Sequence, residues 1–304
     1  MSATTESPRR LTVADIAKRY ADGQRIPMLT AYDYPTARLL DEAGIPFILV
    51  GDSLGTVMLG YDNEIPVSMA DMLHHTAAVT RGARHALIVG DMPFLSYASI
   101  DLAIANAGRF LSEAGAQAVK LEGGVRSART IEALVRAGIP VVGHIGWTPQ
   151  AANAAGKIKV QGKDKNHARA LLADALAVQE AGAFAIVLEL IPAQLAQAIT
   201  DRLRIPTIGI GAGAGCSGQV QVVTDLLGLA AWRPRHAKAY ADLRGIILEA
   251  AAAYAADVEA GTFPGEAQTV RMDDGILDEA LGRGDHDRLG NTMPAGGIPL
   301  DRDL

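Results

Sequence analysis

Short apolar runs alternate with longer amphipathic stretches along most of the chain. The apolar runs are rich in Val and Ile and end in Gly or a charged residue, which is typical of buried strands. We predict strands at Ile26–Thr30, Phe47–Val50, Ala86–Val89, Ala118–Leu121, Pro140–His144, Phe184–Leu188 and Pro206–Ile210. Because apolar residues continue through each run without alternation, both faces of the strands should be buried, as in a parallel sheet.

The stretches between these runs are rich in Ala and Leu and have helical spacing. Examples are Asp71–Arg81, Ile100–Ala114, Ala128–Ala137 and Ala168–Ala181. Several stretches close with Ala-Gly, where the glycine is Gly44, Gly115, Gly138 or Gly182. Glycine just past a helix adopts the left-handed conformation cheaply, so the dipeptide predicts a helix end. The chain therefore repeats a unit of helix, glycine and strand.

Seven such units in one chain favour a closed (β/α)₈ TIM barrel over a doubly wound open sheet, which is the second possibility. The eighth strand has the faintest pattern, and we place it near Gln219–Val223. The predicted organisation is a single domain with extra terminal segments. It consists of an N-terminal extension (1–24), a catalytic barrel with a C-terminal helix (25–270) and an acidic, Gly-rich tail (271–304).

Composition narrows the possible surroundings and partners. The 304 residues carry a formal net charge of −6, whereas a general nucleic-acid binder usually has a basic surface. The single cysteine, Cys216, rules out an internal disulfide and indicates a reducing compartment. Residues 1–10 are polar and lack the apolar centre of a signal peptide, and no apolar run reaches ~18 residues. We expect a cytoplasmic protein with no membrane or nucleic-acid partner.

Four acidic residues follow predicted strands directly: Asp52, Asp91, Glu122 and Glu189. Catalytic groups of a (β/α)₈ barrel lie at the carboxyl ends of the strands, so these side chains should converge on one mouth. Clustered carboxylates repel one another, and oxygen ligands of this kind suit Mg²⁺. The alternative is that each acid caps a helix or ends a solvated loop, which is common for one acid and less so for four.

Two basic side chains accompany the acids. Lys120 lies two residues before Glu122, so strand alternation places both on one face. Its ammonium suits a substrate carboxylate or a developing enolate oxygen, and a structural ion pair is an equal alternative. His144 ends the fifth predicted strand and should point to the same mouth, although it could also be a satisfied core histidine.

With these residues, the chain closely resembles the ketopantoate (3-methyl-2-oxobutanoate) hydroxymethyltransferase family over about Arg10 to Pro264. Long segments carry the resemblance, among them Val50-Gly-Asp-Ser-Leu-Gly55, Val119-Lys-Leu-Glu-Gly-Gly124, Gly143-His-Ile-Gly-Trp-Thr-Pro-Gln150 and Lys159-Val-Gln-Gly162. The resemblance implies a (β/α)₈ fold and one Mg²⁺ per subunit. It also implies a homo-oligomer, often a decamer.

The implied reaction transfers a hydroxymethyl group from 5,10-methylenetetrahydrofolate to 3-methyl-2-oxobutanoate. The product, 2-dehydropantoate, leads to pantothenate. By position, the resemblance assigns metal binding to Asp52, Asp91 and Glu122. It assigns the 2-oxo acid site to Asp52, Ser53, Asp91, Lys120 and His144. Glu189 would be the base that removes the proton at C3, with the metal as Lewis acid and an enolate as intermediate.

Departures from the family pattern lie after the fifth strand, at Ser217, Thr224 and His236. They bear on folate binding, subunit contacts or substrate scope more than on enolisation. Two other functions stay open: a metal-dependent 2-oxo acid lyase or aldolase that needs no folate, and a non-catalytic paralogue that serves as a scaffold. The basic loop with Lys163 and Lys165 suggests a contact with the glutamate carboxylates of folate, or else only a solvated loop.

Overall fold

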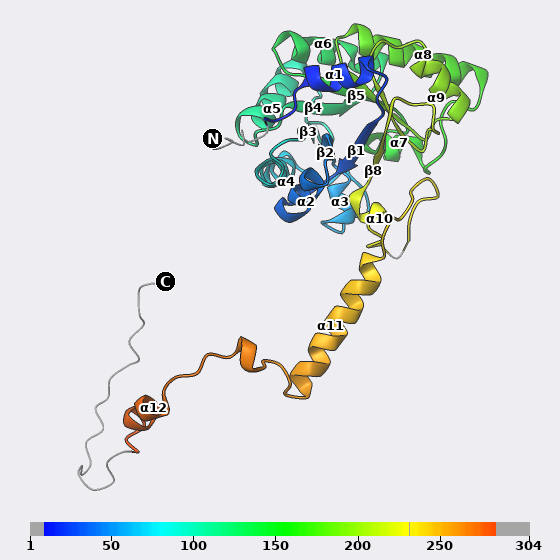
Figure 1. Cartoon of the computed structure of the whole chain (residues 1–304). Helices are drawn as coiled ribbons and strands as arrows, with labels where there is room; N and C mark the ends of the chain where they lie inside the picture. Colours follow the sequence, from blue (N-terminus) through cyan, green and yellow to red (C-terminus); the bar gives the residue numbers. More distant parts are fainter. Residues whose placement is uncertain (1–8, 231, 284–304) are drawn as a thin grey trace, which may run out of the picture. The chain divides into compact units, whose positions relative to one another are not determined.

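The computed structural model describes residues 9–230 and 232–283 (Figure 1). Contacts divide the chain into two compact units, Met1–Arg244 and Gly245–Leu304. The predicted boundaries at residues 24 and 270 do not coincide with this division. They remain a prediction, and residues 284–304 of the predicted tail lie outside the described residues.

Eight parallel strands form a closed barrel in chain order, and β8 completes it by pairing with β1. The strands are β1 (Ile26–Thr30), β2 (Phe47–Val50), β3 (Leu87–Asp91), β4 (Ala118–Glu122), β5 (Val141–Gly146), β6 (Ala185–Glu189), β7 (Thr207–Ile210) and β8 (Gly218–Gln221). The predicted TIM barrel is therefore confirmed and the open sheet is wrong. The eighth strand ends earlier than predicted, because the N–H of Val223 donates to Thr30 Oγ1 and Val223 begins a helix.

One helix precedes β1, and the other helices of the first unit follow strands around the barrel (Figure 1). They are α1 (Val13–Ala21), α2 (Tyr34–Glu42), α3 (Leu54–Val57), α4 (Met69–Gly82), α5 (Ile100–Ser112), α6 (Ala128–Arg136), α7 (Ala152–Ala155), α8 (Lys165–Glu180), α9 (Ala193–Thr200) and α10 (Val223–Leu226). All four Ala-Gly glycines have a positive φ, between 74° and 95°. The predicted left-handed helix ends are therefore confirmed.

The strands bury both faces, as the unbroken apolar runs predict. Their outer face packs on the helices in one core cluster, for example Ile88 of β3 with Phe110 of α5. Their inner face forms a second cluster that fills the barrel, and Ile16 of α1 belongs to it. Ile16 is fully buried, which contributes about 1.5–3 kcal/mol. The predicted N-terminal extension thus includes a helix that packs on the barrel interior.

The second unit contains most of α11 (Leu243–Glu259), the 3₁₀ turn η3 (Glu266–Gln268) and α12 (Asp274–Ala280). No side chain of α11 is buried, and its large apolar residues are exposed: Ile246, Ile247, Leu248, Tyr254 and Val258. In the part of the chain that the structure describes, no helix is long and apolar enough to cross a membrane.

Candidate active site

Charged side chains continue the inner apolar rows of β3 and β4. Leu87 and Val89 of β3 lie in the barrel core, so Asp91, the next residue of that row, points the same way. On β4, Ala118 lies in the core and Lys120 and Glu122 continue its row. The strand register places Asp91 opposite Lys120. Acid and base therefore meet at the carboxyl end of the barrel.

The next two strands repeat this arrangement. Val142 of β5 is a core residue and His144 follows it in the same row, opposite Glu122. Val187 of β6 precedes Glu189 in the same way. Gly146 stands opposite Glu189, and a Cβ there would lie 2.1 Å from the Glu189 carbonyl oxygen. This close approach requires glycine at position 146.

The remaining predicted residues follow β2. Asp52 is 4% exposed, and its N–H donates to Asp91 Oδ2 at 3.2 Å. Ser53 precedes α3 and its hydroxyl lies 2.9 Å from the hydroxyl of Tyr32. The structure thus brings together all seven residues that the sequence assigned to the site.

A buried ion pair joins β3 and β4. Lys120 Nζ donates to both carboxylate oxygens of Asp91, at 2.7 and 2.6 Å. Burial disfavours the ammonium, but attraction to Asp91, Asp52 and Glu122 is stronger, so the pKa of Lys120 is raised and it stays charged. Burial raises the pKa of Asp91 against the attraction of Lys120. The alternative of an ion pair, left open by the sequence, is thus present in the structure.

His144 lies between two carboxylates. Its Nδ1 is 3.6 Å from Glu122 Oε1, and its Nε2 is 3.2 Å from Glu189 Oε2. Burial, followed by the nearby charge of Lys120, lowers the pKa of His144 well below its usual value. The imidazole is therefore neutral, with one nitrogen that donates and one that accepts. Both ring nitrogens are buried, and neither makes a hydrogen bond with a described residue.

Glu189 is the carboxylate that solvent reaches. Its side chain is 18% exposed, whereas that of Glu122 is 1% exposed. Burial raises the pKa of Glu189 to about 7, against the opposing charges of Lys120 and His236. A carboxyl group with a pKa near neutrality, open to a small molecule, is suited to general acid–base catalysis.

The mouth holds more carboxyl groups than cationic ones. Four carboxylates, Asp52, Asp91, Glu122 and Glu189, surround the single ammonium of Lys120. Burial, followed by repulsion from Asp52 and Asp91, raises the pKa of Glu122 well above its usual value. Glu122 Oε1 is buried with no hydrogen-bond partner among the described residues. A buried, unpartnered oxygen in an acidic cluster is a suitable ligand for a hard cation.

The metal ligation itself remains a prediction. Within residues 9–230 and 232–283, no group of three or more His, Cys, Asp or Glu side chains is arranged to hold a metal ion. Both oxygens of Asp91 accept hydrogen bonds from Lys120 in the structure. The donors are carboxylate oxygens, the type that Mg²⁺ prefers.

Two further residues of this mouth, Gln150 and Tyr97, are not acids at strand ends, so the search for such acids does not find them. Gln150 lies in the 3₁₀ turn η2 (Pro149–Ala151), and its side-chain amide donates to Asp52 Oδ2 at 2.8 Å. Tyr97 donates to the same amide at 2.6 Å. Gln150 ends the family-like segment after β5, which was the only sequence signal for it.

Glu64 is another residue near the mouth that the sequence analysis did not select. It lies between α3 and α4, where the Tyr61 N–H donates to the Gly55 carbonyl at 2.8 Å and folds this loop over α3. Burial, followed by repulsion from Asp52, raises the pKa of Glu64 to about 7. It follows no strand, so the search for acids at strand ends passes over it.

The three departures from the family pattern lie at different places. Ser217 precedes β8 and bonds with Thr207 at the start of β7, so it belongs to the opposite end of the barrel. Thr224 is buried in α10, and its hydroxyl has no partner in the described part of the chain. His236 packs over Gly211, where a Cβ would lie 3.2 Å from its Cγ, and its charge acts on Glu189. Only His236 is therefore linked electrostatically to the mouth.

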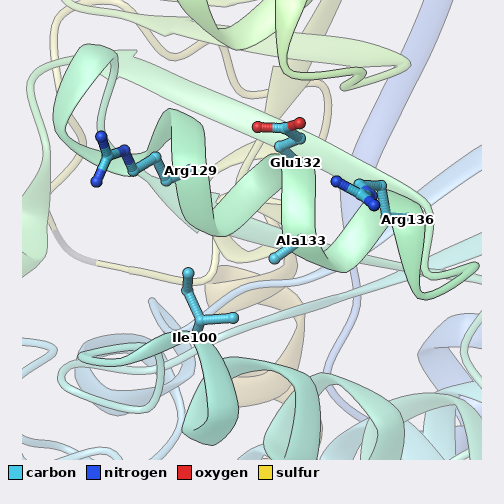
Figure 2. Close-up of a pocket in the computed structure, with 5 residues that line it drawn as sticks. All are labelled: Ile100, Arg129, Glu132, Ala133 and Arg136. Atoms are coloured by element: carbon cyan, nitrogen blue, oxygen red, sulfur yellow. The ribbon is translucent and has the colours of Figure 1, made fainter.

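A groove of about 430 Å³ lies elsewhere, between α6 and the start of α5 (Figure 2). Its lining is Ile100, Arg129, Glu132, Ala133 and Arg136. In Figure 2 the guanidinium groups of Arg129 and Arg136 lie on either side of Glu132. None of the residues at the barrel mouth lines this groove, so it is separate from the candidate active site.

A closed α/β barrel with ionisable groups at the carboxyl ends of its strands defines a TIM-barrel enzyme. The chain belongs to the ketopantoate hydroxymethyltransferase family, whose model matches residues 10–266. The resemblance found in the sequence, over about Arg10 to Pro264, is thereby confirmed.

Two curated relatives illustrate how close the match is. The chain is 64% identical to the 3-methyl-2-oxobutanoate hydroxymethyltransferase of Chloroflexus aurantiacus over 277 residues, which cover 91% of this chain and 98% of the relative. It is 54% identical to that of Gluconacetobacter diazotrophicus over 273 residues, 90% of this chain and 99% of the relative.

Solved structures resemble the chain more distantly. A phosphoenolpyruvate phosphomutase from Streptomyces platensis subsp. rosaceus superposes with a TM-score of 0.57 at 17% identity, covering 90% of this chain and 96% of that one. A phosphonopyruvate hydrolase in complex with oxalate and Mg²⁺ gives 0.55 at 14%, with the same coverage. At these identities the likeness shows the fold alone.

Proposed function

We propose that the chain transfers a hydroxymethyl group from 5,10-methylenetetrahydrofolate to 3-methyl-2-oxobutanoate, giving 2-dehydropantoate. Near-full-length relatives that are 64% identical carry the name of this activity. The observation in the structure that supports it most is Glu189, a carboxylate open to solvent, with a pKa of about 7, in an otherwise closed acidic mouth.

Glu189 acts as the general base in this proposal and removes the C3 proton of the 2-oxo acid. Neutral His144 packs beside this carboxylate, with its Nε2 3.2 Å from Glu189 Oε2. A positioned base of this kind accelerates proton transfer by about 10²–10⁴-fold. The ammonium of Lys120 supplies positive charge for the substrate carboxylate or the enolate oxygen. Ser53, fixed by Tyr32, completes the 2-oxo acid site together with Asp52 and Asp91.

Mg²⁺, one per subunit, would be held by Asp52, Asp91 and Glu122. When bound, it would supply a Lewis acid that polarises the keto group of the 2-oxo acid. The residues of this chain support that role because a cation would relieve the repulsion among the clustered carboxyl groups and would give the unpartnered Glu122 Oε1 a partner. Asp91 is shared with Lys120, so binding of the cation and the position of the Lys120 ammonium are coupled.

The lyase or aldolase alternative shares the fold and the acids. A 2,3-dimethylmalate lyase does superpose with a TM-score of 0.52, but at 14% identity. This likeness shows only the fold, so no observation favours that chemistry over the folate-dependent transfer. The scaffold alternative has no support either, because the structure brings the predicted site residues together at one mouth.

We also propose a cytoplasmic homo-oligomer, as the family resemblance implies. Large apolar side chains of α11 are exposed, and exposed apolar surface of this kind is a common sign of a protein interface. Light scattering after gel filtration tests this. A monomer at micromolar concentration would contradict it, and the measured mass decides whether the assembly is a decamer.

The first experiment is proton exchange at C3 of 3-methyl-2-oxobutanoate in D₂O with Mg²⁺ and without folate, followed by NMR. We expect exchange in the unchanged chain, and a loss of about 10²–10⁴-fold in Glu189→Gln. Glu132→Gln on α6 is the matched control and should exchange normally. Exchange that is equal in Glu189→Gln would contradict its role as the base.

Addition of 5,10-methylenetetrahydrofolate then tests the transfer itself. Formation of 2-dehydropantoate supports the proposed function. Metal-dependent exchange without that product, in the presence of the folate, would instead favour an enolising lyase or aldolase.

A further inference from the structure

A glutamine in the loop after β5 contacts two of the three candidate metal ligands. Gln150 is 5% exposed. Its Nε2 donates to Asp52 Oδ2 at 2.8 Å and to the Met92 carbonyl at 2.9 Å. Its backbone N–H donates to Glu122 Oε2 at 3.3 Å. One residue of β5's loop therefore reaches the acid after β2 and the acid that ends β4.

The orientation of the Gln150 amide is set by its partners. A primary amide has two N–H donors and one carbonyl oxygen, and all three functions are used. The hydroxyl of Tyr97 donates to Oε1 at 2.6 Å, while Asp52 and Met92 accept the two N–H bonds. A flipped amide would turn its oxygen toward the carboxylate and the carbonyl. It would lose both bonds and bring three acceptors together.

We propose that Gln150 is a positioning residue, held by Tyr97, that fixes Asp52 and Glu122 for a divalent cation. The inference rests on the metal site of the proposed function. Gln150 engages Oδ2 of Asp52 and leaves Oδ1 as the oxygen that it does not use. The carboxylate is then oriented in advance, which reduces the ordering that a cation would otherwise have to impose.

The neutrality of the donor is part of the argument. A lysine or arginine at this place would orient Asp52 equally well, but its charge would compensate the carboxylates and weaken the attraction for a cation. An uncharged amide supplies the hydrogen bond and adds no positive charge that would compete with a cation for Asp52 and Glu122. Lys120 in the same mouth is the contrasting case of a charged donor, since its ammonium donates to both oxygens of Asp91.

A purely structural glutamine would behave differently. Gln117 provides the comparison, since its Oε1 accepts the Ile88 N–H at 2.9 Å and its Nε2 donates to the Gly115 carbonyl. Its side chain bonds with backbone groups of β3 and of the loop before β4, and none of these hydrogen bonds involves a carboxylate of the mouth. Replacing such a residue should lower the free energy of unfolding and leave the affinity for a metal unchanged.

The experiment measures Mg²⁺ binding to the full chain by calorimetry, without substrate, together with the free energy of unfolding in EDTA. Gln150→Met keeps the size of the side chain and removes both N–H donors. We expect it to raise the Kd for Mg²⁺ by about 10–100-fold. Tyr97→Phe, which only frees the amide to reorient, should raise it about two- to five-fold. Gln117→Met is the matched control and should leave the Kd unchanged.

Each outcome separates this inference from the proposed function. If the unchanged chain binds Mg²⁺ and Gln150→Met binds it within two-fold, the inference is overturned and the metal site stands. If the unchanged chain does not bind Mg²⁺, the metal site of the proposed function fails and the inference fails with it. Should Gln150→Met not fold, Tyr97→Phe decides: weaker binding supports the inference and unchanged binding overturns it.

Discussion

The two ends of the barrel interior are built on the same strands and contain opposite chemistry. At the amino ends, the inner rows are apolar: Ile26, Phe47, Leu87, Ala118, Val142 and Ala185 all lie in one buried cluster. At the carboxyl ends, the rows of β3, β4, β5 and β6 finish in Asp91, Lys120, Glu122, His144 and Glu189. On these four strands, neighbouring residues of one row therefore have opposite effects: the apolar ones stabilise the fold and the ionisable ones oppose it.

The difference shows that burial alone does not define a core. Asp91, Lys120 and Glu122 are nearly as buried as the apolar residues beneath them, at 1–4% exposure. Buried apolar groups gain free energy on leaving water, whereas buried charges lose hydration and recover it only through partners. Here the acids outnumber their cationic partner, so the mouth is held in place by the apolar layers and by the helices outside the barrel.

The largest expected effect tests the apolar end. Phe47 is fully buried in the inner cluster, so Phe47→Ala should lower the free energy of unfolding by about 3–5 kcal/mol. The Kd for Mg²⁺ should stay within about two-fold, because the cavity lies at the other end of the barrel. Urea denaturation and calorimetry measure the two quantities.

A substitution at the carboxyl end of the barrel completes this comparison. Glu122→Gln at the mouth removes a buried carboxylate, so it should leave the metal-free chain equally or more stable while weakening Mg²⁺ binding. A loss of stability as large as that of Phe47→Ala would show that the two ends do not divide their roles in this way.

The second prediction concerns the pH dependence of stability in the metal-free chain. The pKa of folded Glu189, about 7, lies above its ordinary value of 4.5, so the folded state binds this proton more tightly than the unfolded state. The stabilisation is complete below about pH 4.5 and is lost as the pH rises through about 7. We expect the free energy of unfolding to fall by about 1–3 kcal/mol between about pH 5 and pH 8.

Glu189→Gln provides the control for this slope. The amide does not titrate, so urea denaturation in EDTA should show a smaller fall over the same pH range. Asp91 and Glu122 also have raised pKa values and keep part of the slope in the variant. Identical slopes in the two chains would contradict a raised pKa for Glu189.

The same division explains what could be predicted from the sequence. The strands are continuous apolar runs, and acids such as Asp91 and Glu189 stand directly after them, so both the barrel and the convergence of the acids follow from local pattern. Glu64 and Gln150 reach the mouth from loops. Their positions depend on how a loop folds back over its neighbours, and no periodicity along the chain records that. The pairing of Lys120 with Asp91 needed the strand register, which was equally out of reach.

The third prediction tests whether the negative charge of the mouth extends into the loop above it. Glu64 interacts with the charges of Asp52, Glu189 and Lys120, and its pKa is about 7. Glu64→Gln should lower the KM for the 2-oxo acid about two- to five-fold above pH 7, because one repulsive carboxylate is removed. Below about pH 6 the effect should vanish, since Glu64 is then protonated in the unchanged chain.

Asp62→Asn is the matched control for Glu64, because it removes an exposed carboxylate of the same loop. Its KM should match that of the unchanged chain throughout the pH range. A drop in KM that is equal at low and high pH would show that Glu64 acts through its shape and not its charge.

The smallest expected effect lies at the rim, where the acidic mouth gives way to a basic loop. Lys163 and Lys165 are exposed on either side of Asp164, which caps the start of α8 through the N–H groups of Asn166 and His167. If these lysines attract the glutamate carboxylates of the folate, Lys163→Ala with Lys165→Ala should raise the folate KM about two- to three-fold at low salt.

A salt titration and a control double variant with the same change in charge test this last effect. Exposed charges are screened within about 8 Å at physiological ionic strength, so the difference in folate KM should shrink as salt is added, while the KM for the 2-oxo acid stays constant. Arg129→Ala with Arg136→Ala removes the same charge from the separate groove on α6 and should leave both constants unchanged. A folate KM that rises equally in both double variants would reflect the net charge of the chain, and the basic loop would then be only a solvated one.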